Sequence, residues 1–235
     1  MTNTKPHKLN ATFACYLIVA TFLLLIGRAN AGGVALGATR VIYPQGEKQI
    51  SLPVTNSDTK DVFLIQSWVS DAEGNKINDF VITPPLFVIQ PKKENTLRIM
   101  YVGQNNLPQD RETVFYVNSK AIPSADKSKQ SGSSLQIATQ SVIKLFVRPL
   151  KLSTPALDAP KTLRCELSGT NLKVTNPSPY YVTLVQLHVG GKKLENDMVP
   201  PKSSKTIHVA GASGSVTFQT LNDYGAMTEK QTCGS

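Results

Sequence analysis

The chain has 235 residues, of which 40% are hydrophobic and 7% aromatic, so that it can bury a core and is neither disordered nor collagen-like. Its 25 basic and 16 acidic residues give a formal net charge of +9. Three of the basic residues, Lys5, Lys8 and Arg28, precede residue 32, and the remaining +6 is spread in pairs such as Lys92-Lys93, which disfavours nucleic acid as a partner.

Residues 1–31 have the features of a secretion signal. Lys5 and Lys8 precede an apolar run over residues 11–27, and Ala29-Asn30-Ala31 is a small-x-small cleavage site. We therefore expect cleavage after Ala31 and a mature chain that works outside the cytoplasm. The alternative is a signal anchor that stays in the membrane, because an apolar run of this length can just span a bilayer.

The mature chain carries the period-two alternation of β-strands, and no window has a capped helical stripe. Two immunoglobulin-like β-sandwiches in series are therefore the predicted fold, all-β in class. Expected strands of the first domain, residues 32–152, are 34–43, 49–55, 62–69, 80–83, 96–102, 114–121 and 135–147. A Pro-punctuated stretch, residues 153–160, is predicted to be a linker. Strands of the second domain, residues 161–235, are expected at 162–167, 172–175, 181–189, 193–194, 205–209 and 216–221.

Catalytic and metal-binding patterns are missing from the mature chain. His188 and His208 both fall inside predicted strands, where structural histidines are the simpler interpretation. Cys165 and Cys233 are the cysteines left after the signal; a disulfide is expected in an oxidising compartment, two free thiols being the alternative. A single cysteine pair provides too few ligands for a metal. We expect neither an enzyme nor a cofactor.

Residues 107–124 (LPQDRETVFYVNSKAIPS) closely resemble the signature of periplasmic pilus chaperones of the chaperone-usher pathway. Further matches follow one another in order along the mature chain: 33–44 (GVALGATRVIYP), 83–87 (TPPLF), 92–99 (KKENTLRI), 143–149 (IKLFVRP), 176–181 (NPSPYY) and 222–226 (NDYGA). The likeness is greatest to chaperones of type 1 and related pili. It implies a boomerang of two immunoglobulin-like domains, a periplasmic location, pilus subunits as clients and delivery to an outer-membrane usher. Ser119 departs from the family pattern, which usually has an aliphatic residue there.

The resemblance implies that the strand at 135–147 is lent to a client by β-strand addition. Alternation puts Leu135, Ile137 and Thr139 on one face, and alternation alone fits equally well a role in the chain's own core. As a donor strand, these three would fill the groove of the client, with Thr139 standing where relatives usually have an apolar residue. An edge strand of this kind also predicts self-association of the free protein.

Arg40 and Lys144 match the two basic residues with which the family anchors the carboxyl terminus of the client. An Arg and a Lys supply the charge-assisted donors that a partly buried carboxylate needs. Strict alternation puts Lys144 on the face opposite Leu135, so that a bulge or the geometry of the cleft must reconcile the two roles.

Glu112, Arg148 and Asp223 match the ion network that holds the domains of the family together; independent surface charges are the alternative. The loop at residues 122–134 is short and polar, which resembles the branch of the family that assembles thick, rod-like pili, frequently tipped by an adhesin. The rival interpretation is a pilus subunit or adhesin that is itself polymerised. It is disfavoured by the seven strands that precede the linker and by the positions of Arg40 and Lys144.

Overall fold

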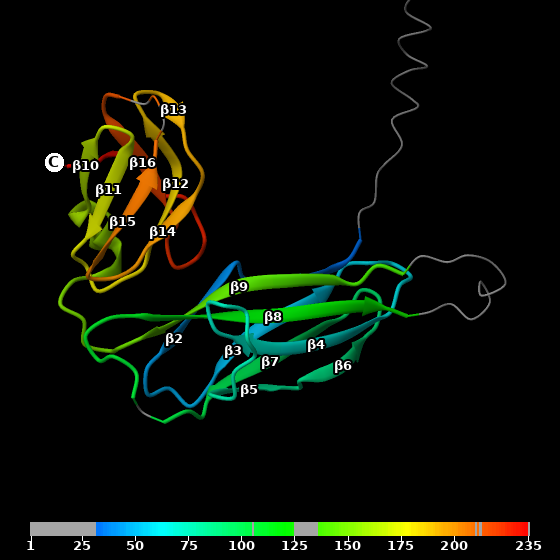
Figure 1. Ribbon diagram of the computed structural model, residues 1–235. Coiled ribbons are helices and arrows are strands. Elements are labelled where there is room, and N and C mark those ends of the chain that lie inside the picture. The colour runs from blue at the N-terminus through cyan, green and yellow to red at the C-terminus, as the bar shows by residue number, and fades with distance from the viewer. Residues whose placement is uncertain (1–31, 105, 125–135, 210, 212, 235) are drawn as a thin grey trace, which may run out of the picture. The chain divides into compact units, whose positions relative to one another are not determined.

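The computed structural model describes residues 32–104, 106–124, 136–209, 211 and 213–234. These residues form strands and one 3-10 helix (Figure 1), so the prediction of an all-β chain is confirmed. Within this part of the chain, no helix has the length and hydropathy needed to cross a membrane. The predicted signal and most of the loop at 122–134 lie outside the described residues.

The first domain is a sandwich of two sheets. A four-stranded sheet has the order β1 (Val34–Leu36), β3 (Ile50–Asn56), β7 (Glu94–Tyr101), β5 (Phe80–Thr83), and a five-stranded sheet has the order β2 (Arg40–Pro44), β9 (Thr139–Arg148), β8 (Thr113–Pro123), β4 (Phe63–Ser70), β6 (Leu86–Ile89). Their inward-facing side chains alternate with outward-facing ones and build one core, which includes Leu52, Val54, Ile65, Leu97, Ile99, Val117 and Leu145.

The predicted strand at 34–43 is two strands in different sheets, which corrects the sequence-based expectation. β1 pairs with β3, whereas β2 pairs with β9. The chain crosses between the sheets at Gly37, whose N–H donates to the carbonyl of Pro53 at 2.8 Å. A Cβ at residue 37 would lie 3.0 Å from the Cβ of Pro53, so glycine permits this close passage.

The predicted strand at 135–147 also differs, because β9 begins only at Thr139. β9 pairs with β8 from Thr139 opposite Ala121 to Val147 opposite Thr113. Continuing this register would place Ile137 opposite Pro123, which has no N–H to donate to the ladder. Gln136 instead donates its side-chain amide to the carbonyl of Pro123. Ile137 is therefore not part of the strand.

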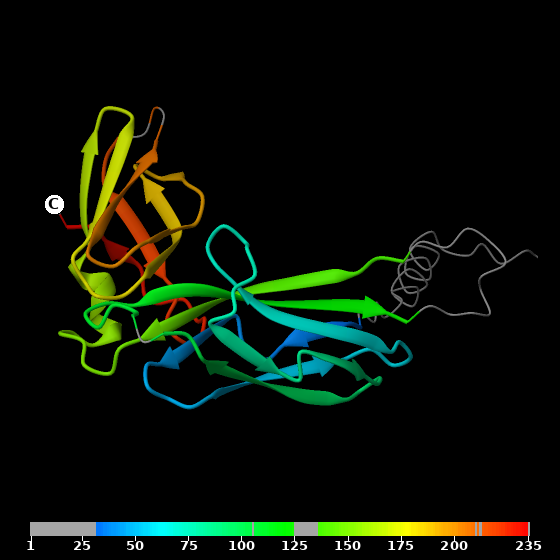
Figure 2. The same cartoon turned by 60° about the horizontal axis from the view of Figure 1, so that its bottom comes forward.

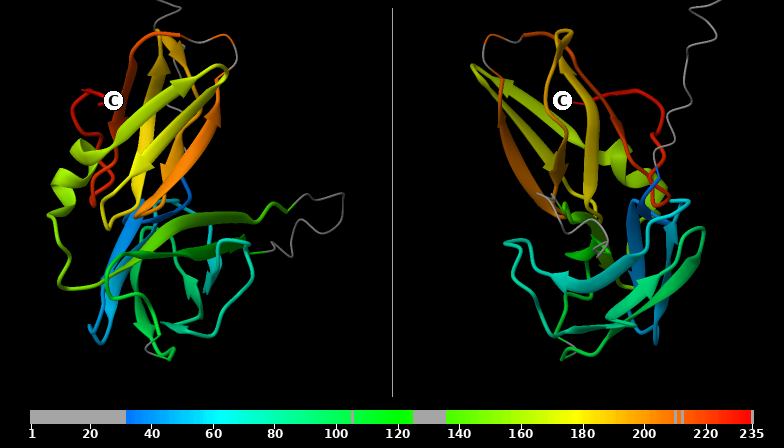
Figure 3. Two further views of the ribbon diagram at one scale, coloured as in Figure 1. Left: turned by 60° about the vertical axis from the view of Figure 1, so that its left-hand side comes forward. Right: turned by 90° about the vertical axis from the view of Figure 1, so that its right-hand side faces the viewer.

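The second domain also has two layers (Figure 3). A three-stranded sheet has the order β10 (Arg164–Ser168), β11 (Asn171–Asn176), β15 (Ser203–His208). A five-stranded sheet has the order β13 (Lys192–Lys193), β12 (Val182–Val189), β16 (Val216–Thr220), β17 (Gln231–Thr232), and β14 (Asp197–Val199) also pairs with β12. Leu172, Leu184, Leu187, Val189, Val199 and Phe218 lie in its core.

The predicted linker is not an extended connection throughout. Its second half belongs to a 3-10 helix, Ala156–Thr162. Ala159 is 2% exposed and Leu163, directly after the helix, is 3% exposed, and both pack in the core of the second domain. Residues 156–163 therefore cover one end of the second sandwich, and β10 begins at Arg164 rather than at the predicted residue 162.

Candidate functional site

Strands β2 and β9 run parallel, and their register places Arg40 directly opposite Lys144. Arg40 is the first residue of β2, so that β2 covers the edge of β9 only from Lys144 to Arg148. On that side of β9, no strand of the described part of the chain pairs with residues 139–143. The long antiparallel pair of β8 and β9 is visible in green in Figure 2. β9 therefore offers an open edge that ends at Arg40.

Side chains on β9 alternate strictly, because its pairing with β8 shows no register shift from Thr139 to Val147. Leu145 and Val147 are buried in the core of the first domain. Lys144 and Phe146 lie on the other face, and the ring of Phe146 contacts that of Tyr181 in the second domain, with ring centroids 5.7 Å apart. No bulge therefore occurs between Thr139 and Lys144, and Lys144 faces the second domain. Leu135, which was expected on the opposite face from Lys144, lies outside the described residues.

Both basic residues are partly withdrawn from water. Arg40 is 9% exposed, and its Nη1 donates to the carbonyl of Leu221 at 3.2 Å. Its buried Nε has no partner among the described residues. Burial lowers the pKa of Arg40, although the negative charges of Asp223 and Glu112 act to raise it.

Lys144 is half-buried, with Tyr116 of the first domain and Asp197 and Lys205 of the second around the hollow that it lines. Burial lowers the pKa of Lys144, and the positive charge of Arg40 lowers it further. In the part of the chain that the structure describes, Lys144 forms no ion pair within 4.0 Å. Two neighbouring cations that lack acidic partners in contact are suited to hold an anion.

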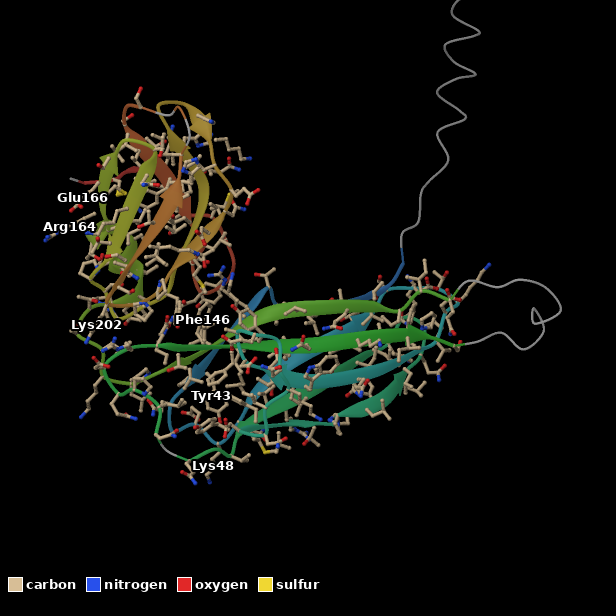
Figure 4. The ribbon with its side chains drawn as sticks, in the orientation of Figure 1. Tyr43, Lys48, Phe146, Arg164, Glu166 and Lys202 are labelled. Atoms are coloured by element: carbon tan, nitrogen blue, oxygen red, sulfur yellow. A yellow bond between two sulfur atoms is a disulfide. The ribbon has the colours of Figure 1, made fainter. Side chains whose placement is uncertain are left out.

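A hollow of about 240 Å³ lies beside Arg40. Phe146 and Tyr181 supply aromatic walls from the two domains, and Leu157 and Tyr224 supply exposed apolar surface. Figure 4 labels Phe146 near the C-terminal end of β9, next to the second domain. Arg148, Asn222 and Asp223 also line this hollow, so the buried guanidinium of Arg40 is surrounded by charged, polar and apolar groups.

The three expected groove residues are only partly placed. Ile137 is 65% exposed and precedes β9, and Thr139 is the exposed first residue of that strand. Leu135 lies outside the described residues. Exposure of Ile137 argues against a role in the protein's own core, which was the alternative to a donor role.

Glu112, Arg148 and Asp223 are brought together at the junction of the two domains. Arg148 donates from Nε to Glu112 at 2.7 Å, and from Nη1 and Nη2 to both carboxylate oxygens of Asp223, each at 2.7 Å. The side chain of Glu112 is 1% exposed, and burial raises its pKa against the opposing effect of Arg148. Burial acts to lower the pKa of Arg148, but the hydrogen bonds and charges of both acids outweigh it and raise that pKa.

Comparison with known proteins identifies the fold and the family. Residues 33–153 match the family described as "Pili and flagellar-assembly chaperone, PapD N-terminal domain", and residues 158–232 match "Pili assembly chaperone PapD, C-terminal domain". The chain belongs to the PapD family of pilus chaperones. Its role is that of a chaperone in pilus assembly, as the resemblance in the sequence implies.

Named relatives support this assignment over nearly the full length. The chaperone is 52% identical over 229 residues to "Chaperone protein FimC" of Escherichia coli strain K12, which covers 97% of this chain and 95% of the relative. "Chaperone protein FocC" of Escherichia coli is 49% identical, over 92% of this chain and 96% of the relative. The crystal structure of the "Periplasmic Chaperone SfaE" superposes with a TM-score of 0.78 at 50% identity, covering 86% of this chain and all of that one.

Cys165 and Cys233 of the chaperone form a disulfide, with Cα atoms 5.7 Å apart. Cys165 is the second residue of the edge strand β10, and Cys233 directly follows β17. Its N–H donates to the carbonyl of Val216 at 2.9 Å, and the N–H of Cys165 donates to Gly234 at 2.8 Å. The bond therefore ties the last residues of the chain across both sheets of the second domain.

Several residues at the domain junction of the chaperone were not singled out by the sequence. The backbone N–H of Tyr181 donates to Glu112 at 2.8 Å, and the ring of Tyr180 lies 5.0 Å beneath the guanidinium of Arg148. Lys202 donates to Asp110 at 2.6 Å, a second ion pair between the domains. The NPSPYY match marked the tyrosines, but pairing across domains leaves no periodic signal in a sequence.

His188 and Ser119 each have a side-chain contact within their own domain. A ring nitrogen of His188 lies 2.7 Å from the carbonyl of Gln186. No group of three or more metal-ligating side chains occurs among the described residues. Ser119 is 4% exposed, with its hydroxyl 3.4 Å from that of Ser67 on the neighbouring strand β4. The hydroxyl of Ser67 thus provides a polar neighbour for Ser119, at the position where the family usually has an aliphatic residue.

Proposed function

We propose that this chaperone works in the periplasm, where it captures pilus subunits on the open edge of β9, completes their fold and delivers them to an outer-membrane usher. Two related structures support the periplasmic location and the kind of client. SfaE is described as periplasmic. SafB, 32% identical with a TM-score of 0.78, is described as a chaperone in complex with the SafA pilin.

The observation that carries the proposal is the parallel pairing of β2 with β9, which stops at Arg40 opposite Lys144. A client strand that adds to residues 139–143 parallel to β9 runs toward the start of β2. It must end there, because β2 occupies the edge from Lys144 onward. Its carboxyl terminus would then arrive beside Arg40 and Lys144, so β2 acts as a stop that fixes the register of the added strand.

A terminal carboxylate matches the charges at this stop. Arg40 and Lys144 are partly buried, and each has its pKa lowered by that burial. A carboxylate between them would pair with both cations and accept charge-assisted hydrogen bonds. Main-chain bonds along β9 would supply affinity that does not depend on the sequence of the client. Leu135, Ile137 and Thr139 would fill the client's groove, with Thr139 as the weakest of the three contacts.

The remaining parts of the proposal concern the domain junction and other partners. Glu112, Arg148 and Asp223 would hold the two domains so that the anchor and the open edge serve one client. Clients would include a tip adhesin of a rod-like pilus. In the absence of a client, the open edge of β9 would favour self-association of the chaperone, since unpaired edge strands readily add another strand.

Co-expression with the cognate pilus subunit tests this function. We expect the wild-type chaperone to co-purify with the subunit in a one-to-one complex. Lys144→Met, which keeps the length of the side chain without its charge, should lose at least about tenfold in complex yield, because the carboxylate would meet one cation instead of two. Lys193→Met removes the same charge from the exposed strand β13, which lies at the end of the second domain away from β9 (Figure 1), and should bind as wild type does.

Circular dichroism and thermal unfolding of both variants control for folding. Equal binding by a folded Lys144→Met variant would contradict the proposed anchor. Failure of the folded wild type to hold the subunit would contradict the proposed function as a whole.

A further inference from the structure

Lys144 borders a second hollow, separate from the one beside Arg40. Its volume is about 320 Å³. Tyr116 on β8, the residue directly opposite Lys144, belongs to its first-domain wall. The second domain supplies the rest of its wall, which consists of Thr183, Asn196, Asp197, Met198 and Lys205. The ammonium of Lys144 therefore stands between Arg40 on one side and a polar surface of the second domain on the other.

Asp197 is held firmly in that wall. It is the first residue of β14 and pairs in register with Leu184 of β12. Its Oδ1 accepts the N–H of Met198 at 2.7 Å and forms an ion pair with Lys205, and its side chain is 27% exposed. Carboxylates have capacity for several donors, so that these two contacts leave Asp197 able to accept a third from the hollow.

A second group in the same wall lacks a partner. Thr183 is 6% exposed, and its Oγ1 has no hydrogen-bond partner among the described residues. A buried hydroxyl without a partner costs stability, so this wall carries an unsatisfied polar atom close to the hollow that Thr183 lines. The hollow thus offers Lys144 the carboxylate of Asp197, which Lys144 would share with Lys205, while the positive charge of Arg40 repels Lys144.

We propose that Asp197 competes with the client's terminal carboxylate for the ammonium of Lys144. In the free chaperone, Lys144 is drawn toward Asp197 across the hollow. When a client ends beside Arg40, its terminal carboxylate attracts the ammonium of Lys144 away from Asp197. When the client leaves, Lys144 returns to Asp197. This inference rests on the proposed function and adds a residue that lowers affinity and eases release. The negative charge of Asp197 acts to raise the pKa of Lys144, which agrees with an attraction between the two side chains.

The matched comparison is Asp197→Asn against Glu166→Gln. Glu166 on β10 also pairs with a lysine, Lys173, at 3.5 Å, but it lines neither of the two hollows. Figure 4 labels Glu166 on the second domain, away from Phe146. Both substitutions remove one negative charge from the second domain, so a general electrostatic effect on an anionic client would appear in both.

The probe is a synthetic peptide of alternating apolar and polar residues with a free carboxyl terminus, alongside the same peptide with an amidated terminus. We expect Asp197→Asn to bind the free-acid peptide up to about fivefold more tightly than wild type, the range in which ion pairs near a surface act. Glu166→Gln should be unchanged. In a Lys144→Met background, Asp197→Asn should have no effect, because the competition requires the ammonium.

The outcomes separate this inference from the function on which it rests. A wild type that binds the acid and the amide equally contradicts the carboxylate anchor itself. A wild type that prefers the acid, with Asp197→Asn no tighter than Glu166→Gln, contradicts only the role of Asp197. An NMR titration of the Lys144 side chain without a client gives a second readout: Asp197→Asn should lower its pKa, and an unchanged pKa would overturn the contact.

Discussion

Glu112 shows how the chaperone places a charge at the junction of its domains. The carboxylate is almost fully buried, and it accepts hydrogen bonds from Arg148 and from the backbone of Tyr181. Even so, burial outweighs these contacts and raises its pKa above 4.5. The ionised form is therefore less favoured in the folded chaperone than in the unfolded chain, and the pair with Arg148 serves geometry more than stability.

The pH dependence of stability tests this account of Glu112. Because the pKa of Glu112 is higher in the folded state, the protonated form favours folding and the ionised form opposes it. The contribution of Glu112 to the free energy of unfolding is therefore greatest below pH 4.5 and is lost as the pH rises through the folded-state pKa. Glu112→Gln cannot titrate at this position. We expect wild type to lose free energy of unfolding relative to the variant between about pH 4 and pH 7, as measured by urea unfolding. A relative gain over the same interval would show that Arg148 lowers this pKa instead.

Residue types at the site could be predicted from the sequence, but their contacts could not. Arg40 and Lys144 were expected to act together, and the parallel register of β2 and β9 places them opposite each other. Asp197 gave no signal, because its relation to Lys144 arises only where the two domains meet. Its partner Lys205 lies eight residues along the chain, on another strand.

At the scale of elements, alternation located most strands but not their ends. Gly37 divides one predicted strand between two sheets, since passage beside Pro53 leaves no room for a side chain. Pro123 limits the ladder that was expected to reach residue 135. The short strand β6, Leu86–Ile89, was missed because four consecutive apolar residues give no period-two pattern. Edge strands β14 and β17 have three and two residues, too few for any periodic signal.

The disulfide between β10 and the segment after β17 gives a prediction at this scale. Replacing Cys165 and Cys233 together by serine removes a link between residues 68 positions apart. On the chain-entropy description, the free energy of unfolding should fall by up to about 4 kcal/mol. Thermal unfolding followed by calorimetry should show the loss in the second domain, with the first domain unchanged. Equal destabilisation of both domains would mean that they unfold as one unit.

At the scale of the whole molecule, the two domains complete one another's site. The first supplies the open edge of β9 and both cations, and the second supplies Leu221, Tyr181 and Asp223 around Arg40. Among the described residues, two ion pairs join the domains, Arg148 with Asp223 and Lys202 with Asp110. Ion pairs near a surface contribute little free energy individually, so under the proposed function these two would act for a client through domain orientation.

The central claim is that a client adds as a parallel strand to the edge of β9 and ends at Arg40. Amide hydrogen exchange of the chaperone, measured by mass spectrometry with and without its cognate subunit, tests it most directly. We expect new protection in residues 139–143 and none in residues 144–148, whose edge β2 already covers. Protection confined to another edge strand such as β6, with residues 139–143 unchanged in a formed complex, would contradict the claim.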